Sequence, residues 1–288
     1  MSRTLLIDGH NFAFRAFYGI SDLTRSDGFP TNAIHGWLRT CWRLEDEEKP
    51  DFVTVFFDCG GDDEREKLLP EYKANRSSCP EDLVLQLPWI KKLVQACGYD
   101  CQERRGIEAD DLIAAAAKAL AKRGDEVLIA SSDKDLSQCV GPSVLQLLPP
   151  PTANPRLGWR RLNEDGVEAK FGIRPGQVAD YLALVGDSAD NIPGLSGVGP
   201  KTAVKWLQAY RNLEGVIENA GRLTPKRFCS MVYEGREKLR RNIQLTTLRD
   251  NLQVSISSSS SPDLVALQEI LKTMEMNKSL DEALRRYG

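Results

Sequence analysis

The sequence is poor in the residues from which many catalytic and metal sites are built. Its 288 residues include two histidines, His10 and His35, so a histidine-built metal site or a Ser-His-Asp relay is hard to assemble. The seven cysteines are odd in number and scattered, and no two have Cys-x-x-Cys spacing. This excludes a zinc knuckle or a redox motif of that kind and predicts reduced packing residues. Any hydrolytic chemistry must rest on carboxylates.

Long apolar runs are also missing. No run approaches the ~20 residues of a membrane helix, and the N-terminus has no signal-peptide hydrophobic stretch. With 41% hydrophobic and 27% charged residues, the chain can still bury a sizeable core. We expect a soluble, cytoplasmic monomer that makes no contact with membranes.

Charge is unevenly distributed along the chain. The formal net charge is -3, but residues 191–249 hold eleven Lys or Arg against four acids, so this segment is +7 and the remainder -10. A basic lobe joined to an acidic one suggests a polyanion that is held by the first and worked on by metal ions in the second. Solvated basic helix faces are the alternative for any single charge.

Three short apolar runs each end at an aspartate. Continuous apolar runs are typical of strands covered on both faces, and helical segments separate these runs, which predicts a parallel α/β sheet. Side chains just beyond the carboxyl ends of such strands converge on one crevice. The runs and their acids are Thr4–Ile7 with Asp8, Phe52–Phe57 with Asp58, and Val127–Ser132 with Asp133.

Further acids are expected in the same crevice. Residues 108–123 are alanine-rich, with acids in the first turn and cations in the last, and predict a helix. Its first turn carries Glu108, Asp110 and Asp111; Asp135 follows Asp133 by two residues, and Asp187 and Asp190 form a pair three apart.

Nine carboxylates in one crevice would repel one another unless cations neutralise them. Oxygen-only ligation points to Mg²⁺ or Mn²⁺ rather than zinc. The competing interpretation is that individual acids cap helices and strand ends.

The segment 60–102 is too long for an ordinary connection and is predicted to be a lid or binding loop. Within it, Lys73 and Arg76 offer two cations and Tyr72 a stacking face, which suit a phosphodiester and its base. A solvated helical hairpin is the alternative.

A glycine-rich turn opens the basic lobe and leads into a helix at about Pro200. Gly194 and Gly199 are followed by Pro200 before Lys201, so the spacing fails the Walker A motif by one residue. The layout instead predicts a helix-hairpin-helix that seats a DNA phosphate without reading bases.

Taken together, these motifs resemble the bacterial and phage 5' nucleases, that is, flap endonucleases and the 5'-3' exonuclease domain at the N-terminus of bacterial DNA polymerase I. The resemblance runs nearly end to end. The blocks that carry it are LLIDGHNFAFRAF (5–17), FFD (56–58), LPEYKANR (69–76), GIEADD (106–111), SSDKDL (131–136) and ALVGDSADNIPGLSGVGPKTA (183–203).

The resemblance implies a role for each matching residue. All nine acids named above occupy the family's metal positions; Lys73 and Arg76 are the basic arch residues that approach the scissile phosphate, and they are the predicted catalytic residues. Glu64 stands before Arg65 where the family usually has an aromatic, which leaves the role of Arg65 open. The hairpin matches one that can bind K⁺ beside a DNA phosphate. The predicted DNA-binding residues are Tyr72, Arg15, Gly197, Gly199, Lys201, Thr202 and Lys205.

The implied fold is α/β, with a central, mostly parallel sheet flanked by helices (a PIN-like 5' nuclease core), a helical arch insertion and a helix-hairpin-helix subdomain. We expect a nuclease core at 1–186 with the arch at about 60–102, the DNA-binding subdomain at 187–250, and a serine-rich linker with a C-terminal helical segment at 251–288. The chain is expected to be a complete nuclease with no polymerase attached.

The implied activity is two-metal hydrolysis of DNA phosphodiesters by a structure-selective 5'-3' exonuclease and flap endonuclease. It would act on 5' flaps, nicks, primer ends and RNA-DNA hybrids in replication and repair, with two Mg²⁺ ions that Mn²⁺ can replace. One alternative is a non-catalytic DNA-junction binding protein of the same fold. Another is a phosphatase with an aspartyl nucleophile, which would want a second Asp where this chain has His10.

Overall fold

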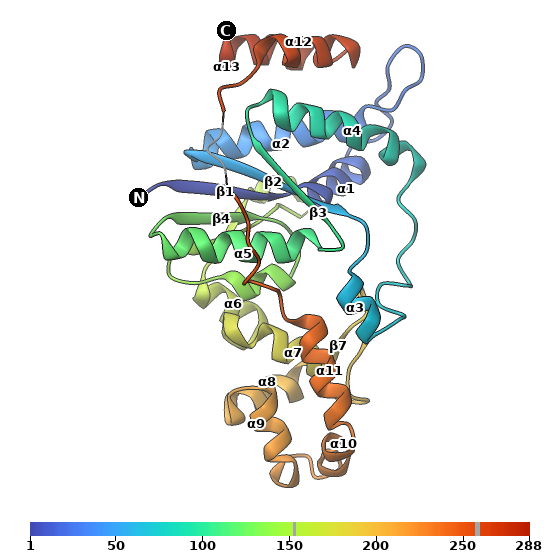
Figure 1. Ribbon diagram of the computed structural model, residues 1–288, viewed down its shortest axis with the longest axis vertical. Coiled ribbons are helices and arrows are strands. Elements are labelled where there is room, and N and C mark those ends of the chain that lie inside the picture. The colour runs from blue at the N-terminus through green and yellow to red at the C-terminus, as the bar shows by residue number, and fades with distance from the viewer. Residues whose placement is uncertain (152–153, 257–259) are drawn as a thin grey trace.

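The computed structural model describes residues 1–151, 154–256 and 260–288. A sheet lies between helical layers, and a helical lobe extends away from it (Figure 1). The strands are β1 (Arg3–Asp8), β2 (Phe52–Cys59), β3 (Asp100–Arg105), β4 (Glu126–Ala130), β5 (Val144–Leu148), β6 (Arg160–Leu162), β7 (Gly186–Asp187) and β8 (Ile192–Pro193). The α-helices are α1 (Gly9–Gly19), α2 (Asn32–Glu48), α3 (Asp63–Leu68), α4 (Glu81–Ala96), α5 (Ala109–Lys122), α6 (Glu164–Phe171), α7 (Val178–Val185), α8 (Pro200–Tyr210), α9 (Leu213–Glu218), α10 (Phe228–Glu234), α11 (Arg236–Thr246), α12 (Leu264–Thr273) and α13 (Asn277–Tyr287). Short 3₁₀ helices are η1 (Asp135–Cys139), η2 (Pro155–Leu157), η3 (Pro175–Gln177) and η4 (Ala220–Arg222).

The main sheet has the order β3-β2-β1-β4-β5-β6. β1 to β5 pair in parallel, and β6 joins β5 in the antiparallel direction. The three strands expected from the sequence are confirmed as β1, β2 and β4, whereas β3, β5 and β6 were not predicted. Because β1, β2 and β4 run in parallel, the acids that follow them meet at one edge of the sheet.

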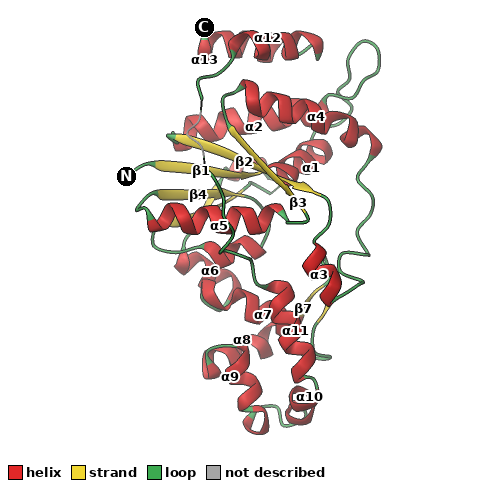
Figure 2. Cartoon of the chain, in the orientation of Figure 1, coloured by secondary structure: helices red, strands yellow, loops and turns green. Residues whose placement is uncertain are grey.

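Helices cover both faces of the sheet, which is why its central strands are apolar throughout. Leu5 and Ile7 of β1 pack with α1, α2 and α4 on one face, while Leu6 packs with α5 on the other. All three side chains have 0% exposure. Figure 2 shows these layers above and below the strands.

The segment 60–102 contains two elements of the core, so the prediction of a long lid was wrong in extent. Leu83, Ile90 and Leu93 of α4 are fully buried in the core cluster that includes α1 and α2. After α4, β3 pairs with β2 at the edge of the sheet. Residues 60–80, which we call the arch segment, lie mostly outside the main core. Leu69 and Tyr72 pack there with Ile192 and Leu245 in a small cluster, and α3 is the one α-helix described in the segment.

The C-terminal helices also belong to the core. Leu267 and Leu271 of α12 are buried in the cluster that contains α2 and α4, and α12 and α13 form an outer layer over these helices (Figure 1). The chain reaches them along the edge of the sheet, where Gln102 donates to the Ser255 carbonyl at 3.0 Å and Arg104 to the Gln253 carbonyl at 2.5 Å. Residues 257–259 of the predicted serine-rich linker lie outside the described residues.

The basic lobe packs in a hydrophobic cluster that it shares with α6, α7 and Leu162 of β6. Trp206 of α8 and Phe228 of α10 meet edge to face, with their rings 5.5 Å apart, and α7 packs against α11. The helix expected from about Pro200 is confirmed as α8. At the entrance to the lobe, β7 and β8 approach so closely that a Cβ on Gly186 would lie 2.4 Å from the Gly194 nitrogen, so only glycine fits there.

Candidate metal centre and nucleic-acid interface

The first group of site acids lies at the carboxyl edge of the sheet. Asp8 ends β1; its Oδ1 accepts from the Asn11 N–H at 3.0 Å and caps α1, and its Oδ2 accepts from the Ser131 hydroxyl at 2.8 Å. Asp58 at the end of β2 accepts from the Ala109 N–H at 2.8 Å, which fixes the start of α5. These hydrogen bonds therefore hold both acids in place at the edge of the sheet.

The negative charges of this group raise the pKa values of its members. Burial raises the pKa of Asp8 to about 7, and the negative charges of Asp58 and Asp133 add to the effect, against hydrogen bonds that lower it. Burial also raises the pKa of Asp110, and the charges of Asp133, Asp8 and Asp58 raise it further. The predicted convergence of Asp8, Asp58, Asp110 and Asp133 is thus seen in the structure.

A second group of acids comes from the start of η1, the end of β7 and the turn between β7 and β8. Asp135, Asp187 and Asp190 each offer a carboxylate oxygen, and these oxygens lie within 4.8 Å of one another. Burial raises the pKa of Asp135 to about 7, with the charges of Asp133, Asp187 and Asp190 contributing. Asp133 therefore lies next to both groups, since it also acts on Asp8.

Cationic side chains serve as counter-ions for the second group. Lys134 Nζ lies 2.6 Å from Asp187 Oδ2 and 3.4 Å from Asp135 Oδ1. Arg76 Nη2 lies 2.5 Å from Asp190 Oδ1. Lys73 pairs with Glu108, and its Nζ is 4.0 Å from Asp190. Sequence reasoning missed Lys134; its place between two site acids was the available signal.

The arch segment is docked on the loop that carries Asp187 and Asp190. The Lys73 N–H donates to the Asp190 carbonyl at 3.0 Å. Asn75 donates to the Ser188 carbonyl and Asn191 to the Glu71 carbonyl, each at 2.7 Å. Main-chain and amide contacts therefore hold Lys73 and Arg76 beside the acids.

Tyr72 does not present the stacking face that was expected. Its side chain is buried, with 7% exposure, and its hydroxyl lies 3.1 Å from both Glu108 Oε2 and Asp190 Oδ2. Burial and these two negative charges raise the pKa of Tyr72, so it remains a hydrogen-bond donor. Tyr72 connects Glu108 to the second group rather than receiving a base.

Asp111 has partners that argue against a metal-ligating role. Arg65 Nη1 and Nη2 lie 2.7 and 2.9 Å from its two oxygens, and Arg249 donates its backbone N–H at 2.8 Å and its Nε at 2.9 Å. Burial would raise the pKa of Asp111, but hydrogen bonds from Arg65 and Arg249 outweigh it, and the pKa is lowered. Both carboxylate oxygens of Asp111 thus already accept hydrogen bonds from arginines.

This pairing also shows what Arg65 does. Arg65 is buried, and it donates to Asp62 at 2.7 Å, to Glu108 at 3.2 Å and to the Leu245 carbonyl at 3.0 Å. It therefore joins the arch segment, the start of α5 and the end of α11. Glu64, which stands where the family usually has an aromatic, pairs instead with Arg249 at 3.0 Å.

The predicted hairpin lies in the basic lobe. Gly197 has a φ of +73°, a conformation that favours glycine, and Gly199 caps α8. Lys201 and Lys205 are exposed on α8, and Thr202 is half-buried. Arg15 lies elsewhere, on α1, where it donates to the Pro150 carbonyl. The structure thus brings the hairpin residues together and separates Arg15 from them.

A parallel sheet whose carboxyl edge gathers several mutually repelling carboxylates defines a class of protein suited to divalent cations. Comparison with known proteins is more specific. Residues 3–172 match the N-terminal resolvase-like domain of 5'-3' exonucleases, and residues 173–272 match their C-terminal SAM fold. The chain belongs to the 5'-3' exonuclease family and is a nuclease.

Individual relatives agree with this assignment. The 5'-3' exonuclease of Aquifex aeolicus is 36% identical over 286 residues, which is 98% of this chain and 95% of the relative. A thermostable DNA polymerase I of Thermus thermophilus is 36% identical over 283 residues, 97% of this chain but 33% of the polymerase, so the chain spans about a third of that relative. The T5 D15 protein, co-crystallised with metal ions, has the same fold: its TM-score is 0.74 at 20% identity, covering 98% of this chain and 99% of that one.

Among the described residues, no helix combines the length and apolar character needed to cross a membrane.

Proposed function

We propose that this protein is a structure-selective 5' nuclease that cleaves DNA at 5' flaps, nicks and primer ends and depends on two divalent cations. The observation that carries the proposal is the proximity of Asp135, Asp187 and Asp190, whose oxygens lie within 4.8 Å of one another. RNA-DNA hybrids are further substrates in this proposal, and removal of primers and flaps during replication and repair, in the cytoplasm and as a monomer, is the corresponding role.

The donor set fits hard cations such as Mg²⁺, with Mn²⁺ as a substitute, because it offers carboxylate oxygens alone. Asp135 Oδ1 is buried and makes no hydrogen bond to the described residues; the nearest positive charge is Lys134 Nζ at 3.4 Å, which a metal ion could replace. We assign one ion to Asp8, Asp58, Asp110 and Asp133, and the other to Asp135, Asp187 and Asp190, with Glu108 adjoining them through Tyr72 and Lys73. Asp111 is left out of this set.

Bound divalent cations would supply charge neutralisation and activation of water for phosphodiester hydrolysis, leaving a 5'-phosphate and a 3'-hydroxyl. The side chains of the protein have complementary tasks. Lys73 and Arg76 now neutralise Glu108 and Asp190. Once those acids are neutralised otherwise, both cations become free to stabilise the charge that develops on the scissile phosphate. They are the catalytic residues of this proposal.

The basic lobe would hold the duplex. Lys201 and Lys205 project from α8 beside the hairpin of Gly197 and Gly199, so backbone N–H groups and ammonium groups can share one DNA phosphate. K⁺ beside this hairpin, with Thr202 nearby, is part of the proposal. In this proposal, residues 1–186 cleave the DNA backbone, residues 187–250 bind DNA, and residues 251–288 pack against the core and stabilise it.

The test is a labelled 5'-flap DNA incubated with the protein in Mg²⁺ or in EDTA. We expect cleavage only with Mg²⁺, loss of cleavage in Asp135→Asn, and little change in DNA affinity in that variant. Asp165→Asn, an exposed aspartate of α6, is the matched control and should cleave normally.

Two results would contradict the proposal. Normal cleavage by both Asp133→Asn and Asp135→Asn would put the active site elsewhere. Binding of the flap in both conditions without any cleavage would favour a junction-binding protein.

A further inference from the structure

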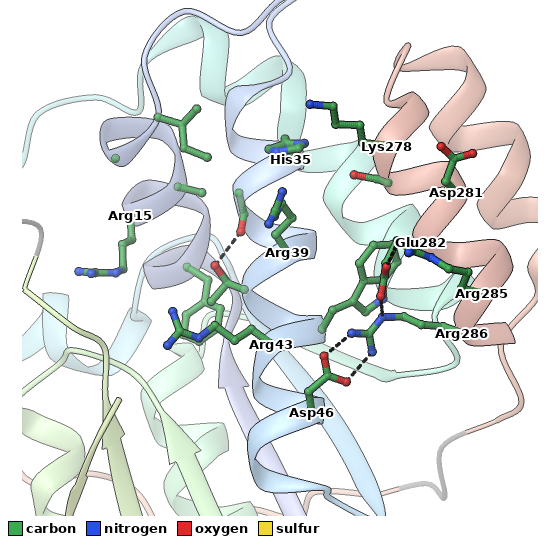
Figure 3. A pocket seen from close by; sticks show the side chains of 18 of the residues that line it. Arg15, His35, Arg39, Arg43, Asp46, Lys278, Asp281, Glu282, Arg285 and Arg286 are labelled. Atoms are coloured by element: carbon green, nitrogen blue, oxygen red, sulfur yellow. Dashed lines mark hydrogen bonds and ion pairs between the residues drawn. The ribbon is translucent and has the colours of Figure 1, made fainter. Parts of the chain in front are cut away.

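A groove that the nuclease proposal does not use lies between α1, α2 and α13 (Figure 3). It has a volume of about 1210 Å³. Asp46, near the end of α2, marks its far end; β2 starts soon afterwards at Phe52, so this end lies at the opposite edge of the sheet from Asp58. The groove is therefore distinct from the candidate metal centre.

The floor of the groove is apolar. It is formed where α1 and α2 touch, at Ala16, Ile20 and Gly36. A Cβ on Gly36 would lie 2.8 Å from the Ala16 Cβ and 2.7 Å from Ile20 Cδ1, so glycine is what lets these helices meet. Leu284 of α13 adds an apolar side chain that is 42% exposed. A ligand that fills the groove would bury apolar surface.

The rim of the groove is basic although it belongs to the acidic part of the chain. Six Lys or Arg line it against three acids, an excess of three positive charges. Some of the cations are already paired: Arg286 with Asp46 at 2.9 Å, Arg43 with Glu47 at 2.6 Å, and Arg285 with Glu282.

The other three cations make no ion pair with any described residue. Arg15 of α1 donates to the Pro150 carbonyl instead, which leaves Arg39 and Lys278. Both are exposed, Arg39 on α2 and Lys278 on α13. Figure 3 shows them on opposite sides of the opening between the two helices. Negative charge entering the groove would meet a cation from each wall.

We propose that this groove binds an acidic peptide segment of a partner protein, with carboxylates at Arg39 and Lys278 and apolar side chains on the floor. The excess of positive charge favours an acidic occupant. The volume of the groove favours a peptide over a small molecule, because it exceeds the roughly 300–1,000 Å³ of small-molecule pockets and suits several consecutive side chains.

Nucleic acid fits the groove less well. A duplex backbone would satisfy the cations but leave the apolar floor in water. A single strand would need exposed aromatic faces for its bases. The aromatic side chains Phe12 and Trp42 that line the groove have 2% and 3% exposure, and the guanidinium of Arg286 lies 5.2 Å from the Trp42 ring centre.

The chain offers a clean reporter, since its only histidines are His10 and His35. His35 lines the groove, whereas His10 lies beside Asp58, with 3.6 Å between its Nδ1 and Asp58 Oδ2. The probe is a synthetic peptide of alternating Asp and Leu, titrated into the full-length protein while the histidine side-chain signals are followed by NMR. We expect the His35 signals to move and the His10 signals to stay.

Affinity is measured in parallel by fluorescence anisotropy of the labelled peptide. We expect the double variant Arg39→Glu/Lys278→Glu to weaken binding by roughly tenfold or more, while flap cleavage stays normal. The control Lys122→Glu/Lys272→Glu reverses two exposed lysines on α5 and α12 and should bind like the unaltered protein. A peptide with Asn in place of Asp should bind roughly tenfold more weakly, as should one with Ser in place of Leu.

Three outcomes would overturn the proposal. One is equal binding by the groove variant and the control variant. Another is movement of the His10 signals alone, which would mean that the acidic peptide binds elsewhere. The third is displacement of the peptide by an oligothymidylate in a manner that depends on Arg39, which would make the groove a nucleic-acid site. Because flap cleavage is scored separately, failure here leaves the nuclease proposal intact.

Discussion

Asp110 and Asp111 are neighbours in the first turn of α5, yet their surroundings are opposite. Asp110 is surrounded by Asp8, Asp58 and Asp133, and burial together with their charges raises its pKa. Asp111 is clamped by Arg65 and Arg249, and its pKa is lowered despite burial. The charge of the buried Asp111 is balanced by arginines within the chain, whereas the half-buried Asp110 lies among other acids, an arrangement that suits a cation from outside. We therefore propose that Asp110 belongs to the metal site and that Asp111 has a structural role.

Asp110→Asn is expected to have the largest effect on activity. The neutral amide removes a negative charge from the group of Asp8, Asp58 and Asp133. We therefore expect the rate of 5'-flap cleavage to fall by about 10³-fold, which corresponds to roughly 4 kcal/mol in activation free energy. The metal-free protein should be equally or more resistant to urea, because like-charge repulsion is relieved. A variant that cleaved normally would remove Asp110 from the active site.

Asp111→Asn tests the carboxylate that is paired with arginines. It replaces one charged partner of the buried Arg65 and the half-buried Arg249 with a neutral one, while Asp62 still pairs with both, so we expect a loss of up to about 3 kcal/mol in the free energy of unfolding. Urea unfolding followed by circular dichroism measures this, with Asp165→Asn as the control. Cleavage by the folded fraction should persist. Unchanged stability together with lost cleavage would return Asp111 to the ligand set.

The acids whose pKa values are raised should also make cation binding depend on pH. The pKa values of Asp8 and Asp135 are about 7 in the folded protein against an ordinary 3.8. Between these limits the folded state binds more protons than the unfolded state, so these two groups make the metal-free protein less stable as pH rises. Mg²⁺ must displace the same protons.

We therefore expect Mg²⁺ to raise Tm more at pH 8 than at pH 6, with affinity rising by up to about tenfold per pH unit for each proton displaced. Thermal melts with and without Mg²⁺ at the two pH values measure this. An equal rise in Tm at both would contradict it.

The smallest expected effect concerns the basic lobe. Lys201→Ala should weaken binding to all DNA sequences alike and reduce the slope of log K against log salt by about 0.9, the contribution of one phosphate. Lys122→Ala on α5 is the control. A slope that does not change would exclude a phosphate contact by Lys201.

Much of the site could be predicted because topology alone brings strand ends together. Asp8, Asp58 and Asp133 follow apolar runs that read clearly as parallel strands. The partners of Arg65 could not be predicted in this way, since the Leu245 and Thr247 carbonyls that it contacts lie 180 and 182 residues away. Long-range contacts of this kind have no local signature.

The extent of the arch segment was overestimated for a different reason. The apolar residues Leu83, Ile90, Leu93 and Val94 recur at helical spacing and are buried in α4, but the charged residues before them obscured this pattern. The same applies to Tyr72, whose neighbours Lys73 and Arg76 suggested an exposed surface. Its hydroxyl instead completes a buried hydrogen-bond network, which no single-sequence pattern reveals.

The place of Asp133 has a consequence for how cations would load. Its charge acts on Asp8 and Asp110 on one side and on Asp135 on the other. An ion that neutralises Asp133 from either side lowers the electrostatic attraction available to the next ion. A calorimetric isotherm with Mn²⁺ should therefore depart from two independent sites, the second event being the weaker. At low cation concentration one ion would be bound. The cleavage rate would then depend on occupancy of the weaker of the two cation sites.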